Sequence, residues 1–129
     1  METRTSVSFE IEELFDFERL QVYRIAREHL AMVIDAGEEL PSRAWKQRDH
    51  LDRAADSVQF NIAEGSGKRR GTKDRKRFFD FAQASAMECA AVWDNLQMRK
   101  HLSLDTAQQA RILLKRVISM LYKLSQDHS

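Results

Sequence analysis

Glycine and proline are scarce in this chain, with only four glycines and one proline among 129 residues. An all-β domain needs a turn roughly every 8–12 residues, usually marked by Gly, Pro or Asn. Long runs of Ala, Leu, Arg, Lys, Glu and Gln stand in their place, and these residues favour helices. The sequence therefore predicts an all-α fold, and its length is that of one domain.

Apolar residues recur at alternating spacings of three and four, which is the pattern of one buried helix face. The pattern predicts four helices, over residues 16–36, 42–64, 73–100 and 104–125. Short connections between helices of this kind favour an antiparallel up-down four-helix bundle. We expect the bundle domain to span residues 16–126. Residues 1–15 show no clear period and are expected to form an N-terminal arm.

The ends of the expected helices carry recognisable signals. Gly37 is placed to end the first helix, and Gly65 and Gly67 are placed to end the second, as glycines commonly do after a helix C-terminus. Ser42, Ser103 and either Thr72 or Asp74 are expected as N-caps, because their side-chain oxygens can accept from free backbone N–H groups.

Composition excludes several protein classes. No stretch approaches the roughly 20 apolar residues of a membrane span, and acidic residues occupy the place of a signal peptide's apolar run. The single cysteine, Cys89, excludes an internal disulfide and a cysteine-rich zinc site. We therefore expect a cytoplasmic protein without cofactor or metal.

Charge is balanced over the whole chain but not along it. Residues 1–66 hold 8 basic and 14 acidic side chains, whereas residues 67–129 hold 13 basic and 6 acidic ones. Such polarity favours an anionic partner on one side of the molecule, or head-to-tail association of copies.

Much of the positive excess lies in residues 68–77, which we call the basic segment. Its seven cations are Lys68, Arg69, Arg70, Lys73, Arg75, Lys76 and Arg77. Four of them lie at the expected start of the third helix, where the helix dipole disfavours cations and favours bound anions. This arrangement predicts binding of an RNA or DNA backbone. Two alternatives are salt bridges to the acidic half of a neighbouring copy and a simple solvated surface.

Four polar residues fall near the expected buried faces of the second and third helices: Asn61, Glu64, Ser85 and Glu88. Buried polar groups need hydrogen-bond partners, so we expect these residues to form a structural network that fixes the register of the bundle. The alternative is a Glu64–Glu88 carboxylate pair that transfers protons or holds a metal. A di-iron bundle also uses a Glu-x-x-His motif, which is missing here. His29 is expected to pack in the core, and Cys89 to be a buried thiol.

Residues 51–67 carry the string LDRAADSVQFNIAEGSG, with Asn-Ile-Ala-Glu-Gly near its end. This string resembles the signature of the four-helix bundle family that includes proteins encoded in intervening sequences of bacterial large-subunit ribosomal RNA. The resemblance extends over roughly residues 15–126, through Phe17, Leu20, Val22, Tyr23, Ala26 and Leu30 and through Phe78, Phe79, Ala82, Ser85 and Glu88. A glycine of the family is Ala84 here.

The resemblance implies an antiparallel four-helix bundle that assembles into a ring, a homopentamer. The chain is also similar to the accessory protein of diversity-generating retroelements, which binds nucleic acid and a reverse transcriptase. We therefore expect a non-enzymatic oligomer that binds RNA or DNA through the basic segment. The alternative is a protein-interaction scaffold, for example a reverse-transcriptase accessory, whose basic segment makes salt bridges between proteins.

Overall fold

The computed structural model describes residues 14–126, and all regular structure in that part of the chain is helical. The four long helices are α1 (Gln21–Glu39), α2 (Trp45–Ser66), α3 (Lys73–Met98) and α4 (Leu104–Ser125). Short 3-10 turns, η1 (Asp16–Arg19) and η2 (Ser42–Ala44), precede α1 and α2. Residues 1–13 of the expected N-terminal arm lie outside the described residues.

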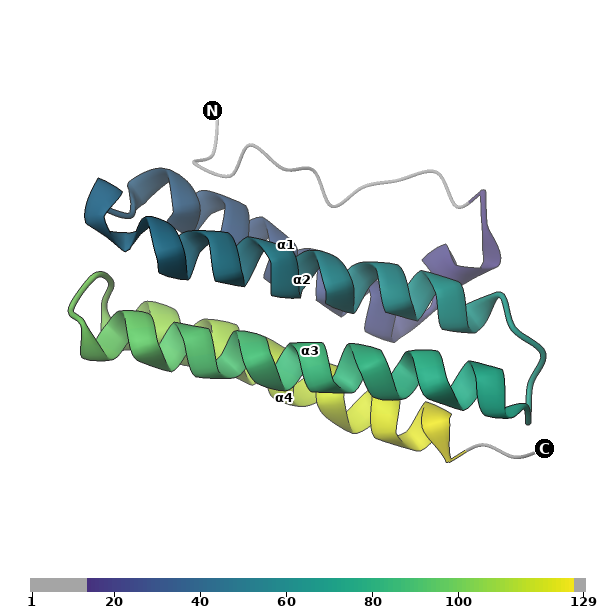
Figure 1. Ribbon diagram of the computed structural model, residues 1–129. Coiled ribbons are helices and arrows are strands. Elements are labelled where there is room, and N and C mark those ends of the chain that lie inside the picture. The colour runs from purple at the N-terminus through teal and green to yellow at the C-terminus, as the bar shows by residue number, and fades with distance from the viewer. Residues whose placement is uncertain (1–13, 127–129) are drawn as a thin grey trace.

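Consecutive helices run in opposite directions and form an up-down bundle (Figure 1). Helices α1 and α3 each pack against both α2 and α4, so α2 and α4 lie across the bundle from each other. The α2–α3 connection and the end of α4 lie at one end of the bundle, and the other two connections lie at the opposite end (Figure 1). The expected four-helix bundle is therefore confirmed. No helix within residues 14–126 is long and apolar enough to cross a membrane.

Two of the expected N-caps are confirmed. Thr72 Oγ1 accepts from the backbone N–H of Arg75 at the start of α3, and Ser103 Oγ accepts from that of Thr106 at the start of α4. Ser42 instead begins the 3-10 turn, and α2 starts at Trp45 with no side-chain cap.

Gly67 is the C-cap of α2, as expected. The expectation for Gly37 and Gly65 is wrong, because both lie inside a helix and both are buried. A Cβ on Gly37 would lie 3.2 Å from Arg48 Nε, and a Cβ on Gly65 would lie 2.9 Å from two ring carbons of Phe79. These glycines therefore allow close packing of α1 on α2 and of α2 on α3.

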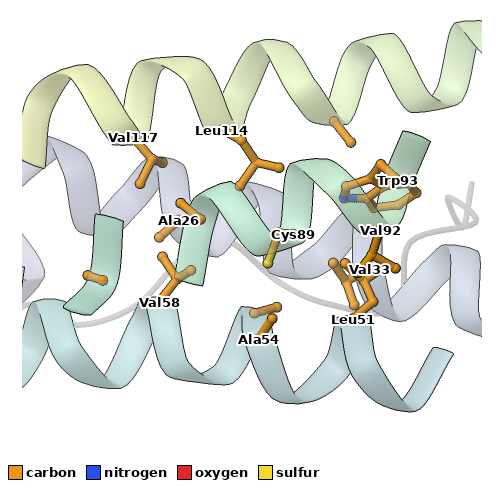
Figure 2. Packing of buried hydrophobic residues seen from close by; sticks show 14 of the residues in the cluster. Ala26, Val33, Leu51, Ala54, Val58, Cys89, Val92, Trp93, Leu114 and Val117 are labelled. Atoms are coloured by element: carbon orange, nitrogen blue, oxygen red, sulfur yellow. The ribbon is translucent and has the colours of Figure 1, made fainter. Parts of the chain in front are cut away.

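The core is continuous along the bundle and is contributed by all four helices (Figure 2). The spacing of apolar residues in the third helix predicts a buried stripe of Phe78, Ala82, Ser85, Cys89, Val92 and Leu96. In α3 the buried set also includes Phe79, Ala86 and Trp93, while Phe78 and Ser85 are only half-buried. The difference arises because α3 packs more extensively against its two neighbours, α2 and α4, than any other helix does, and so buries two adjacent seams. His29 is buried, as expected.

Candidate functional site

The basic segment joins α2 to α3 and continues into the first turns of α3. Gly71 has a φ of 79°, a conformation that an L side chain rarely adopts, and it lets the chain turn into α3. Thr72 then caps the helix and also donates its hydroxyl to the carbonyl oxygen of Arg69 across 2.7 Å. The connection therefore has a defined conformation that presents the cations at one end of the bundle.

Arg75 has a structural role that the sequence pattern did not reveal. Its Nη1 donates to the carbonyl oxygens of Gly65, Ser66 and Lys68 across 3.2–3.3 Å, and its guanidinium lies 4.8 Å from the centre of the Phe79 ring. The carbonyl groups of Gly65 and Ser66 lie in the last turn of α2, where the helical i→i+4 bonds end, and that of Gly65 also accepts from the backbone N–H of Lys68. Arg75 therefore ties the end of α2 to the start of α3, and its guanidinium donors are directed at the protein.

Three further cations of the segment make local contacts on the surface. Lys76 pairs with Asp80 across 2.7 Å, and Arg77 pairs with Asp74 across 2.9 Å. Lys68 Nζ and the Arg77 guanidinium lie 5.3 and 5.2 Å from the centre of the Phe78 ring. Solvent-exposed ion pairs of this kind contribute little free energy, so an incoming phosphate can replace the carboxylates.

Arg69, Arg70 and Lys73 have exposed side chains, as Arg77 does. Within residues 14–126 neither Arg69 nor Lys73 has a carboxylate partner. Arg75 is thus tied to the protein, and Lys68, Lys76 and Arg77 make surface contacts. Arg69 and Lys73 are exposed without a carboxylate partner in the described part of the chain, and Arg70 is exposed but has a contact of its own.

The four polar residues expected to form one network divide as well. Asn61 Nδ2 donates to the carbonyl oxygen and to Oγ of Ser57, and Ser57 Oγ lies 2.8 Å from Ser85 Oγ. The structure therefore joins Asn61 to Ser85 through Ser57, a residue that the sequence pattern did not single out. Glu64 is exposed on the last turns of α2 and lies outside this network.

Glu88 instead pairs with His50, whose Nε2 lies 2.5 Å from Glu88 Oε2. Both side chains line an open groove of about 320 Å³ between α2 and α3, together with Lys46, Asn95 and Arg99. His50 and Glu64 are fourteen residues apart on α2, or about 21 Å by helical rise. Glu64 and Glu88 therefore lie too far apart to share a proton or a metal.

The described residues offer neither a reactive thiol nor a cluster of metal ligands. Cys89 is fully buried, and burial, with a smaller contribution from Glu88, raises the pKa of its thiol to about 12. The thiolate that would act as a nucleophile is thus strongly disfavoured. In the described part of the chain, no three His, Cys, Asp or Glu side chains are grouped so as to hold a metal ion.

Comparison with known proteins identifies a family over most of the chain. A comparison with curated proteins found no match. A family model described as 23S rRNA-intervening sequence protein matches residues 18–123, which include all of α1, α2 and α3 and most of α4. This match covers most of the chain, and the chain belongs to the family of 23S rRNA-intervening sequence proteins.

Proposed function

We propose that this protein is a non-enzymatic nucleic-acid-binding bundle that contacts the phosphates of RNA or DNA through the basic segment. The observation that carries the proposal is the placement of exposed cations around the N-terminus of α3. Arg69, Arg70 and Lys73 are exposed there, and the helix dipole disfavours such cations unless an anion is bound. The family's name, which refers to 23S rRNA, supports an RNA-related role.

The proposed contacts are directed at the nucleic-acid backbone and not at base edges. Lysine and arginine side chains on phosphates position a protein but carry no sequence information directly. The ring of Phe78 lies against Lys68 and Arg77, so the segment offers little free aromatic surface. We therefore expect binding by the segment to depend weakly on sequence and strongly on salt.

The test is a variant in which Arg69, Arg70, Lys73 and Lys76 are replaced by Ala, with Arg75 retained because it ties α2 to α3. Binding of mixed-sequence RNA and DNA is measured by fluorescence anisotropy at several salt concentrations. Each lost phosphate contact is expected to reduce the slope of log K against log salt by about 0.7 to 0.9. The affinity is expected to fall similarly for all sequences.

A matched control replaces Arg43, Lys46, Arg99 and Lys100 by Ala. These four cations are exposed at the opposite end of the bundle, and their removal changes the net charge by the same amount. The control is expected to retain most of the parent's affinity. If both variants bind with the parent's affinity and salt slope, the basic segment does not bind nucleic acid.

A second candidate function is a scaffold in which the basic segment docks an acidic protein surface. The outward face of α2 favours this candidate, because Asp49 and Asp56 are exposed on it together with Trp45 and Phe60. Contact between the basic segment of one copy and this face of the next would assemble a ring, which the family resemblance implies to be a pentamer. Light scattering tests this candidate: the basic-segment variant would then fall apart into smaller species, whereas a nucleic-acid site would leave the assembly intact.

A further inference from the structure

Three exposed cations lie on the outward face of the C-terminal half of α4, namely Lys115, Arg116 and Lys123. None of the three forms a salt bridge with any described residue. The dipole of α4 accounts for a cation in its last turn, such as Lys123, but not for two cations in its middle. We call these residues, together with Tyr122, the α4 cationic face.

The α4 cationic face adjoins the basic segment. Leu124 and Ser125 line a small cavity of about 50 Å³ together with Lys73 and Lys76. The end of α4 and the start of α3 also lie side by side at the same end of the bundle (Figure 1). Lys123 and Tyr122 therefore lie at the same end of the molecule as the basic segment, and Lys115 and Arg116 extend the positive charge from there toward the middle of α4.

Tyr122 adds to this face an aromatic ring that the basic segment lacks. Tyr122 is 57% exposed, so its ring is open to solvent and to a ligand. Lys115 and Tyr122 are seven residues apart, which places them on the same side of α4, and Lys123 follows directly. An exposed aromatic ring among cations is the combination that stacks a base while its phosphates are neutralised.

We propose that the α4 cationic face extends the nucleic-acid site and selects single strands, with a base stacked on Tyr122 and phosphates bound by Lys115, Arg116 and Lys123. The proposal rests on the function proposed above, since the strand continues from the basic segment. Only a single strand, or a frayed end, exposes a base face to a tyrosine, because bases in a duplex are already stacked.

The experiment compares two probes, a labelled single-stranded oligonucleotide and its duplex with the complementary strand. Stacking on an aromatic ring contributes about 1–3 kcal/mol per base, so Tyr122→Ala is expected to weaken single-strand binding about 5- to 150-fold and to change duplex binding little. Tyr122→Phe retains the ring and is the matched control, expected to bind both probes like the parent.

A second variant, with Lys115, Arg116 and Lys123 replaced by Ala, is expected to flatten the single-strand salt slope by about two units. The inference is wrong if this variant and Tyr122→Ala both bind the single strand as the parent does. If the basic-segment variant alone then loses binding, the proposed function stands without this extension.

Three other outcomes would also overturn the inference. An equal loss of single-strand and duplex binding in Tyr122→Ala would exclude stacking as the cause. If light scattering showed a smaller assembly for the variant that lacks Lys115, Arg116 and Lys123 than for the parent, the α4 cationic face would lie in an interface between copies. Failure of the parent protein to bind either probe would overturn both this inference and the proposed function.

Discussion

The indole N–H of Trp93 donates to Nε2 of His29 across 2.9 Å, at a place in the core where both side chains are buried. Because the indole can only donate, Nε2 of His29 must be an unprotonated acceptor. The hydrogen bond thus holds the imidazole neutral and satisfies two buried polar groups of α1 and α3 at once.

Burial of His29 predicts that the protein loses stability in mild acid. Desolvation lowers the pKa of this imidazole from 6.5 to about 4 in the folded protein. Between these two values the unfolded chain binds more protons than the folded one, so the free energy of unfolding falls as the pH falls from 6.5 towards 4. The full loss is about 3 kcal/mol for a shift of this size. Chemical denaturation at a series of pH values measures it.

His29→Gln is the control for this pH dependence, because its amide oxygen can accept from Trp93 while the side chain does not titrate. The free energy of unfolding of the variant is expected to change less between pH 6.5 and 4 than that of the parent. The two proteins differ only at residue 29, so the difference between the two profiles belongs to His29. Identical profiles would contradict the lowered pKa.

Gly65→Ala is expected to destabilise the protein even though alanine favours helices. The added Cβ would lie 2.9 Å from Cδ1 and Cε1 of Phe79, whose buried ring has no room to move away. Overpacking of this kind costs about 1–3 kcal/mol, whereas the gain in helix propensity is about 1 kcal/mol. Thermal unfolding should therefore show a lower Tm.

Gly67→Ala is the matched control for Gly65→Ala. Gly67 has a φ of −79°, and the nearest atom to an added Cβ is the Glu64 carbonyl oxygen at 3.5 Å. Alanine fits there without strain and reduces the freedom of the unfolded chain, which should stabilise the protein by about 0.4–1 kcal/mol. If the two substitutions changed Tm equally, the contact with Phe79 would not be what restricts residue 65 to glycine.

Arg75→Ala is expected to destabilise the protein, unlike the same change at Lys73. Removing Arg75 leaves the carbonyl oxygens of Gly65, Ser66 and Lys68 without this donor and removes the cation from the Phe79 ring. The expected loss is about 1–3 kcal/mol of unfolding free energy. Lys73 is exposed and has no carboxylate partner among the described residues, so Lys73→Ala should leave Tm nearly unchanged.

Helix periodicity was sufficient to predict the bundle, because one buried face with 3.6-residue repetition is a local property of the sequence. It failed in α3, which packs more extensively against its two neighbours than any other helix does. Phe79 and Trp93 lie off the single stripe that the pattern selects in α3, yet both are fully buried. A stripe describes one seam, whereas α3 contacts both α2 and α4.

The candidate site shows the same limit more strongly. Proximity in sequence grouped Arg75 with the other cations, but its partners are the end of α2 and the ring of Phe79. The sequence pattern grouped Glu88 with Asn61, Glu64 and Ser85 in one polar network. In the structure it pairs with His50, which is 38 residues away along the chain. Partners across helices depend on helix rotation and register, and a single sequence does not specify these to within one residue.

The hydrogen bond between the hydroxyls of Ser57 on α2 and Ser85 on α3 predicts that substitutions of these two residues have non-additive effects on stability. The two oxygens are 2.8 Å apart and half-buried, and Ser57 also accepts from Asn61 across 3.0 Å. Ser57→Ala, Ser85→Ala and the double variant form a cycle measured by chemical denaturation. Each single substitution should lower the free energy of unfolding by about 1 kcal/mol. The double substitution should lower it by less than the sum of the two single losses, because both single substitutions remove the same hydrogen bond.

Glu64→Ala is the comparison that separates this network from the surface beside it. Glu64 is exposed and takes part in none of these hydrogen bonds. Its replacement should therefore change the free energy of unfolding by no more than about 0.5 kcal/mol, as is typical of surface substitutions. Additive effects of the two serine variants would show that their hydroxyls act independently. A large loss in Glu64→Ala would instead place that carboxylate in a contact formed only in the assembled protein, and light scattering of the variant would then show a smaller species.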